Sequence, residues 1–165
     1  MDYEHVIKGQ EVSLIELEGA VRDSIEELNE CMMTNGKLTR DRIYAAFAKQ
    51  FHGLISAGDI EWQFRPSIKK RKNGKRESAE WLFDLVWYNV VRIGELCLLH
   101  DIALIVESEL SGSLVLVQHD FLKLLCVRSL LKVAIVKCSE KACRNLVKNA
   151  IRECRNVTEG RYMVW

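Results

Sequence analysis

Residues 79–109 contain the runs WLFDLVW (residues 81–87) and IALIVESE (residues 102–109), and these two runs decide the fold that the sequence predicts. Both are apolar and rich in aromatic or β-branched residues, which predicts buried β-strands. However, Asp84 lies inside the first run, and Glu107 and Glu109 lie inside the second. A buried carboxylate is costly unless it is paired, protonated or bound to a cation. All three side chains therefore need a partner.

The residues before these runs predict two helices. Ser13 and Glu16 have the spacing of a capping box, and the helical apolar pattern that follows stops at Gly36. A second helix is expected over residues 39–55. Residues 1–30 carry a net charge of −7 against +1 for the whole chain, which leaves +8 on the remaining residues. We interpret the apolar stripe of this acidic first helix as core contact, with a protein partner or a dimer seam as the alternative.

A basic hairpin is expected between the second helix and the first of the two runs. Residues 60–64 alternate as a strand does, and Asn73-Gly74 is typical of a two-residue turn, so the chain should return through this turn into residues 81–87. The turn is surrounded by the basic residues Lys69, Lys70, Arg71, Lys72, Lys75 and Arg76. They indicate either a solvated hairpin tip or a finger that contacts nucleic-acid phosphates, and the hairpin context disfavours a nuclear-import signal.

The rest of the chain predicts a strand–helix–strand crossover and a final helix. The expected elements are a short crossing segment at 88–101, a strand at 102–109, a helix at 114–131, a strand at 132–138, a helix from the Ser139 cap to Cys154 and an edge strand at 161–165. The final helix is basic through Lys141, Arg144, Lys148 and Arg152. This order predicts an α/β (α+β) fold in which helices flank a mixed central β-sheet.

We expect one domain over residues 1–165, which length and composition favour. Its parts are an N-terminal acidic helix (1–36), a core (39–138), and a basic helix with an edge strand (139–165). No apolar run approaches the roughly 20 residues that cross a bilayer, and the first residues lack the pattern of a signal peptide. A cytoplasmic protein that does not contact membranes is therefore expected.

The three carboxylates have the spacing of a metal site. Glu107 and Glu109 are two apart on a strand, so they should project from one face, while Val106 and Ser108 face away. If the two strands are neighbours, Asp84 is expected on the same face. Three clustered carboxylates would be stabilised by a divalent cation with oxygen ligands such as Mg²⁺.

This order of acids and elements resembles the PD-(D/E)xK phosphodiesterase superfamily, which has the restriction-endonuclease-like fold. The shared features are an acid on the strand after a hairpin, an acid-x-charged tripeptide on the next strand, and then a helix and a strand. The resemblance covers roughly residues 39–138, with Asp84 as the first acid, Glu107 as the second and Glu109 in the place usually held by lysine. It implies cleavage of DNA, or less often RNA, with Mg²⁺ or Mn²⁺ on Asp84, Glu107 and the Ser108 backbone carbonyl.

The sequence departs from the family pattern at two positions. Phe83 replaces the proline before the first acid, and Glu109 replaces the lysine. Some restriction enzymes resemble this sequence in using glutamate at that position, as a metal ligand or as the base that orients water. In other members a lysine from a neighbouring element takes over, and Lys123 and Lys132 are the candidates. Lys132 joins Asp84, Glu107 and Glu109 in the predicted catalytic set.

The sequence therefore predicts a Mg²⁺-dependent endonuclease whose hairpin bases and last-helix bases hold the nucleic-acid backbone. A homodimer is expected if both strands of a duplex are cut. Two alternatives stay open. Asp84 and Glu107 could pair with Lys or Arg from the basic segments, or the fold could serve as a catalytically inactive nucleic-acid-binding or protein-interaction module with a regulatory role.

Overall fold

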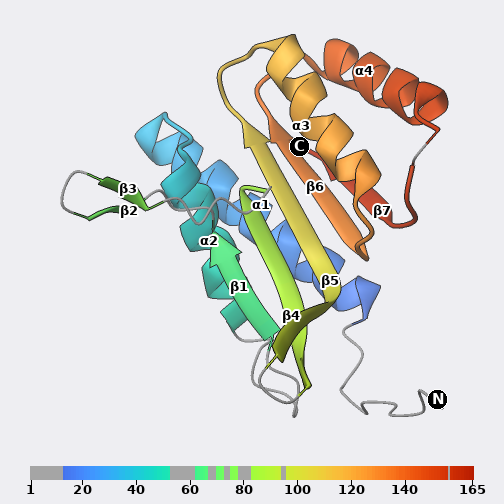
Figure 1. The fold of residues 1–165 in the computed structure, drawn as a ribbon. Helices are drawn as coiled ribbons and strands as arrows, with labels where there is room; N and C mark the ends of the chain where they lie inside the picture. Colours follow the sequence, from blue (N-terminus) through green and yellow to red (C-terminus); the bar gives the residue numbers. More distant parts are fainter. Residues whose placement is uncertain are drawn as a thin grey trace.

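The computed structural model describes residues 13–52, 62–66, 70–72, 75–77, 83–93, 96–155 and 157–165. In chain order its elements are α1 (Leu14–Asn35), α2 (Arg40–His52), β1 (Trp62–Pro66), β2 (Lys70–Lys72), β3 (Lys75–Glu77), β4 (Leu85–Ile93), β5 (Leu96–Glu109), α3 (Leu114–Cys126), β6 (Leu131–Val136), α4 (Glu140–Glu153) and β7 (Arg161–Val164). Five strands form one sheet in the order β1-β4-β5-β6-β7, and β2 pairs only with β3 (Figure 1). The predicted α/β class with a mixed sheet is confirmed.

The direction of the strands changes at β5. β1, β4 and β5 are antiparallel, whereas β6 runs parallel to β5 and β7 runs parallel to β6. A parallel pair needs a long crossover, and α3 provides it between β5 and β6. As a result β5 lies in the middle of the sheet, with an antiparallel neighbour on one side and a parallel neighbour on the other.

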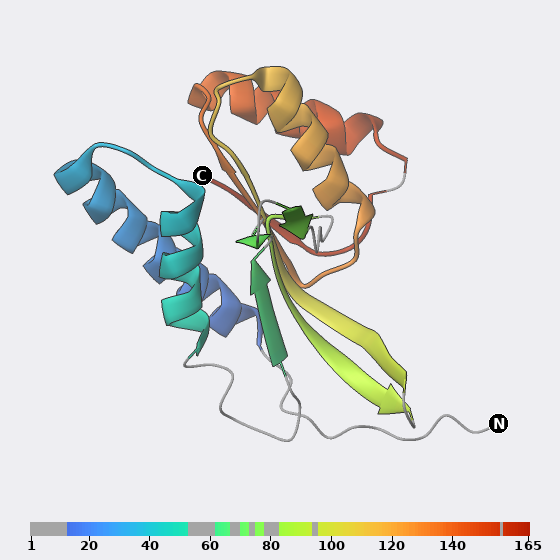
Figure 2. The ribbon, with the colours of Figure 1, turned by 60° about the vertical axis from the view of Figure 1, so that its left-hand side comes forward.

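Two helical layers enclose the sheet (Figure 2). The face covered by α1 and α2, here the α1–α2 face, has a core that includes Phe47, Trp87 and Val106. The opposite α3–α4 face buries Ile105 and Phe121, among others. Since side chains alternate along a strand, Val106 and Ile105 point to opposite layers, and the same alternation separates Ser108 from Glu107 farther along β5.

The predicted helix starts are confirmed. In the capping box of α1, the Glu16 amide donates to Ser13 Oγ at 3.2 Å and the Ser13 amide donates to Glu16 Oε2 at 3.1 Å. Gly36 follows α1 in the left-handed conformation, with φ of 67°. Ser139 caps α4 by accepting from the Ala142 amide. Among the described residues, no helix combines the length and apolar character that a bilayer crossing requires.

The predicted crossing segment at residues 88–101 is wrong. β4 continues to Ile93 and β5 begins at Leu96, so the two strands form a long antiparallel hairpin. The ladder has register irregularities between Trp87 and Tyr88 and between Asn89 and Val90, but pairing continues through them. The predicted return of β1 into the next strand is confirmed, because β1 pairs with β4.

The predicted basic turn lies partly outside the described residues, which omit Lys69, Asn73 and Gly74. The backbone pairing of Lys72 with Lys75 agrees with a two-residue turn between β2 and β3. The predicted second helix also extends past residue 52 into residues outside the description.

The predicted helix over residues 114–131 is too long, because α3 ends at Cys126. Thr158, from a distant part of the chain, contacts the main chain at this end. Its amide donates to the Leu125 carbonyl at 2.9 Å, and its hydroxyl hydrogen-bonds the Val127 carbonyl at 2.6 Å. Main-chain acceptors at the end of α3 are thus satisfied by the segment that precedes β7.

Gly160 is expected to be essential for this segment. Its φ is 131°, and a Cβ atom at this position would lie 2.2 Å from the Ser129 carbonyl oxygen. We predict that Gly160→Ala lowers the free energy of unfolding by about 2–3 kcal/mol in urea denaturation, because backbone must move. The matched control is Gly19→Ala in α1, where no heavy atom lies within 4 Å of the added Cβ. Equal stability of the two variants would contradict the predicted strain.

Candidate active site

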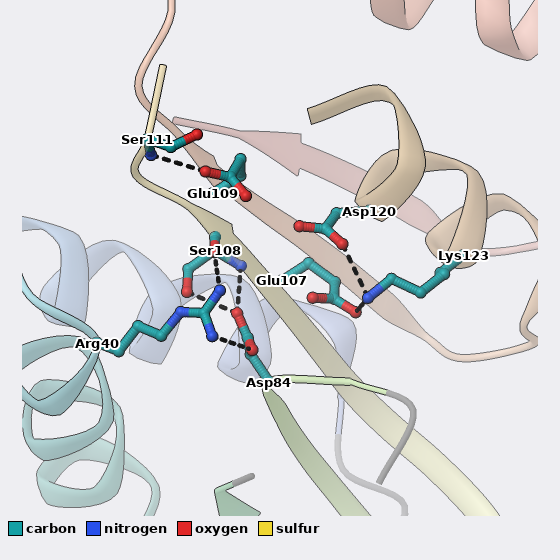
Figure 3. Close-up of polar contacts among 8 residues, drawn as sticks. All are labelled: Arg40, Asp84, Glu107, Ser108, Glu109, Ser111, Asp120 and Lys123. Carbon is teal, nitrogen blue, oxygen red and sulfur yellow. Dashed lines mark hydrogen bonds and ion pairs between the residues drawn. The ribbon is translucent and has the colours of Figure 1, made fainter. Parts of the chain in front are cut away.

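Asp84 lies at the point where the β4–β5 ladder ends. The last paired residues are Leu85 and Val106, and Asp84 immediately precedes β4. Its Oδ2 atom accepts two hydrogen bonds from Ser108 of β5, one from the amide at 2.8 Å and one from the hydroxyl at 2.7 Å (Figure 3). The carboxylate therefore takes the place of the missing strand partner for this amide.

Arg40, the first residue of α2, contacts both Asp84 and Ser108. Its Nη1 atom lies 3.5 Å from Asp84 Oδ1, and its Nη2 atom donates to the Ser108 carbonyl oxygen at 3.3 Å. The Arg40 side chain is 54% exposed, whereas that of Asp84 is 13% exposed. One guanidinium thus bridges a carboxylate and a main-chain carbonyl at the edge of the site.

Glu107 contacts a different helix. Lys123 of α3 places its Nζ atom 2.5 Å from Glu107 Oε1 and 2.9 Å from Asp120 Oδ1 (Figure 3). The Glu107 side chain is 3% exposed and that of Lys123 is 31% exposed. The ion pair is therefore mostly shielded from water on the Glu107 side and open on the Lys123 side.

Burial has the largest effect on the pKa of Glu107. It raises the pKa of this carboxyl to about 8, although the hydrogen bond and the charge of Lys123 act in the opposite direction. The charges of Asp84 and Asp120 raise this pKa further. For Lys123, burial acts to lower the pKa, but its hydrogen bonds to Glu107 and Asp120 raise it overall.

Tyr44 links the two carboxylates electrostatically. It lies on α2 one turn after Arg40 and is buried. Burial raises the pKa of Tyr44 to about 12, and the charges of Asp84 and Glu107 add to this increase while that of Arg40 opposes it. Both carboxylates therefore influence the same hydroxyl, although they contact different helices. Arg40 and Tyr44 were not predicted from the sequence, where their only signal is their four-residue spacing on one side of a helix.

The structure does not gather the three predicted carboxylates on one face. Asp84 precedes the strand, so it escapes the alternation of β4 and joins Ser108 on the side of α2. Glu107 points toward α3 instead, and Glu109 Oε1 accepts from the Ser111 amide at 2.7 Å beyond the end of β5. Among the described residues, no group of three or more His, Cys, Asp or Glu side chains is placed to hold a metal ion.

Lys132 does not reach these carboxylates, which corrects its place in the predicted catalytic set. Its Nζ atom donates to the Thr158 carbonyl at 3.2 Å, the Thr158 hydroxyl at 2.7 Å and the Tyr162 hydroxyl at 3.0 Å. Lys132 pairs with Tyr162 in the register of β6 and β7, and its buried side chain turns toward β7. Burial lowers the pKa of Lys132. The lysine beside Glu107 is Lys123.

The basic segments are described to different extents. Of the hairpin bases, Lys70, Arg71, Lys72, Lys75 and Arg76 lie on β2 and β3, whose backbone alone is described, and Lys69 lies outside the described residues. The α4 residues Lys141, Arg144, Lys148 and Arg152 are all exposed. The alternative expectation, that basic side chains pair with Asp84 and Glu107, matches the structure. However, the bases come from α2 and α3, not from these segments.

The oxygen atoms next to Arg40 fit a divalent cation. Asp84 Oδ1 and the Ser108 carbonyl already share one cationic partner, so both are oriented toward the same point. Mg²⁺ is commonly held by one or two protein carboxylates and keeps several waters, so a cluster of three carboxylates is not required. Glu107 faces Lys123 on the other side of β5, so Asp84 supplies the carboxylate at this point.

The raised pKa of Glu107 predicts a pH-dependent stability. Between the ordinary glutamate pKa of 4.5 and the raised pKa of about 8, the folded protein holds a proton that the unfolded chain has lost, so the free energy of unfolding falls as the pH rises through this window. We predict that the free energy of unfolding of Glu107→Gln, relative to that of the parent, is higher at about pH 9 than at about pH 5 by about 1 kcal/mol or more. Urea denaturation at the two pH values measures this difference. Glu26→Gln, at an exposed position of α1, is the control. A difference between Glu107→Gln and parent that is constant over this range would contradict the prediction.

Comparison of the chain with protein-family models, with curated proteins and with solved structures gives no match. Its function is therefore inferred from the contacts of its own residues.

Proposed function

We propose that the protein is a metal-dependent nuclease that hydrolyses phosphodiester bonds of DNA, with RNA as the less favoured substrate. The supporting observation is that Asp84, just before β4, and Glu107 of β5 lie on either side of β5 near the end of the β4–β5 ladder, each with a cationic partner from a different helix. A buried acid with a strongly perturbed pKa, as Glu107 is, is typical of functional sites. Asp84, Glu107 and the Ser108 carbonyl are the proposed ligands of Mg²⁺ or Mn²⁺.

The order of the elements supports the same proposal. After α2, the strands β1, β4 and β5 are joined as antiparallel neighbours, and α3 then leads to β6, which is parallel to β5. Asp84 precedes the second of these strands and Glu107 lies on the third. This order resembles that of the PD-(D/E)xK superfamily, except that Asp84 lies just before its strand and not on it.

The site residues have different roles in the proposed reaction. A bound divalent ion would polarise a phosphoryl oxygen and acidify water. Asp84 stays oriented by the two donors of Ser108, and Lys123 presents an ammonium next to Glu107, where it can stabilise negative charge that develops on the phosphate. Glu109 is bonded to the Ser111 amide, so we assign the role of the missing family lysine to Lys123 and a structural role to Glu109.

Nucleic acid would be held by the basic surfaces. The exposed α4 bases provide charge for phosphate contacts, and the bases of β2 and β3 are the proposed second contact. α4 packs beside α3, so its basic surface lies in the same helical layer as Lys123, whereas Arg40 and Asp84 lie on the α1–α2 face (Figure 1). The exposed acids of α1, such as Asp23 and Glu26, would be repelled by phosphates and are the proposed surface for a protein partner or a second subunit.

One observation favours a second candidate function. Arg40 already neutralises Asp84, and burial raises the pKa of Glu107 beside Lys123, so neither carboxyl group needs a metal to remain buried. In that case the protein would be a non-catalytic nucleic-acid-binding or regulatory module. Both ion pairs would then serve stability alone.

Substitution of the two acids separates these functions. We predict that Asp84→Asn and Glu107→Gln each lower Mg²⁺-dependent cleavage of plasmid and single-stranded DNA by at least about 100-fold, while circular dichroism shows a folded protein. The control is Asp101→Asn, an exposed acid on the same strand as Glu107. If the parent cleaves neither substrate, or if all three variants cleave as the parent does, the nuclease proposal fails.

The two lysines provide a matched pair. We predict that Lys123→Met lowers cleavage at least about 10-fold because the ammonium next to Glu107 is lost. Lys132→Met, which keeps a buried side chain of similar length, should cleave within about threefold of the parent. The opposite ranking of the two variants would restore Lys132 as the catalytic lysine.

A further inference from the structure

The guanidinium of Arg40 contacts two of the proposed metal ligands. Its Nη1 atom faces Asp84 Oδ1 and its Nη2 atom faces the Ser108 carbonyl (Figure 3). These oxygens belong to different strands of the sheet region, and Arg40 comes from a third element, α2. A cation of the protein therefore stands where the proposed function places a divalent ion.

The contacts of Arg40 are weak enough to be exchanged. Their lengths of 3.5 and 3.3 Å exceed the roughly 2.7–2.9 Å of a strong charge-assisted hydrogen bond. The side chain is also 54% exposed, and exposed ion pairs contribute only about 0–1 kcal/mol. Lys123 differs, because it contacts Glu107 more closely and is also held by Asp120.

Asp84 keeps its orientation without Arg40. Both hydrogen bonds from Ser108 end on Oδ2, whereas Arg40 faces Oδ1. Departure of the guanidinium would therefore free Oδ1 and the Ser108 carbonyl together, with the rest of the carboxylate still fixed. The two freed oxygens are the kind of ligand that hard divalent cations bind.

We propose that Arg40 is a built-in placeholder cation, which neutralises Asp84 in the metal-free protein and is displaced when a divalent ion binds Asp84 Oδ1 and the Ser108 carbonyl. The inference rests on the proposed function for the metal site. In this proposal Arg40 lowers the affinity of the site for the divalent ion, because the ion must first displace the guanidinium. The carboxylate keeps a cationic partner in both states.

Calorimetry without nucleic acid tests this exchange. Mg²⁺ and Mn²⁺ are titrated into the full chain and into Arg40→Met, with Arg40→Gln as a second variant that keeps a polar side chain. We predict that both variants bind the ion about 3- to 10-fold more tightly than the parent, since an exposed ion pair and one hydrogen bond no longer compete. Thermal unfolding checks that each variant is folded.

Arg42→Met is the matched control for charge. Arg42 lies on the same turn of α2, and its Nη1 atom donates to the Lys37 carbonyl at 2.6 Å. Its removal lowers the net charge by the same amount, and we expect metal affinity within about twofold of the parent. An equal gain in Arg42→Met would show a general effect of charge and overturn the placeholder.

The remaining outcomes separate the two proposals. If the parent binds the ion and the Arg40 variants bind it no more tightly, the placeholder is overturned while the metal site stands. If neither the parent nor the Arg40 variants bind Mg²⁺ or Mn²⁺, both the placeholder and the metal site of the proposed function are overturned. Tighter binding that disappears when Asp84→Asn is added to Arg40→Met supports the exchange at Asp84.

Discussion

The hydrogen bonds from Ser108 to Asp84 hold together the region on which the candidate site depends. β4 and β5 are paired as far as Leu85 and Val106, and beyond this point a side chain replaces a strand as the acceptor for the Ser108 amide. Burial of that amide without a partner would cost about 1–3 kcal/mol, so an acid of this length at position 84 is structurally favoured. The same bonds turn the remaining carboxylate oxygen toward α2.

The two acids differ in how firmly their charges are held. Glu107 is almost completely shielded and contacts an ammonium that a second acid, Asp120, also orients. Asp84 faces an arginine that remains half in water. The Glu107–Lys123 contact is therefore the closer and more buried of the two, and the Asp84–Arg40 contact is the more exchangeable one. β5 separates the helices that provide these cations, because Ser108 and Glu107 face opposite layers.

Local signals in the sequence predicted much of the fold. The capping box at Ser13 and the cap at Ser139 depend on residues within one turn, and the alternation of apolar residues places the strands. Asp84 and Glu107 were found because acids are rare in such runs. The end of α3 was placed too late, and the carbonyls there are bonded by Thr158 from beyond the next strand and helix, a contact that local sequence does not reveal.

Side-chain direction was the main limit on predicting the site. β6 is buried on both faces, so its composition does not reveal that Lys132 turns toward Tyr162. Lys123 was only one of two equivalent candidates until the contact with Glu107 distinguished it. Arg40 and Tyr44 were not predicted as site residues, because only the apolar residues of α2 show a regular helical spacing in the sequence. The direction of Asp84 depends on its position just before β4, and single-residue boundaries of this kind are the least certain part of a sequence-based prediction.

The contact between the first helix and the last strand has a consequence for how the chain folds. Arg161 of β7 donates to Glu18 of α1 across a separation of 143 residues, and Leu17 and Val21 of α1 share a core with Val133, Ile135 and Met163. Contacts of such high contact order close large loops, which is entropically slow compared with pairing the β4–β5 hairpin. During synthesis α1 and α2 emerge before the strands that they cover, so the part of the α1 apolar side that faces β6 and β7 is covered later than the part that packs on α2. That part of α1 stays open to chaperone binding until β6 and β7 have been made.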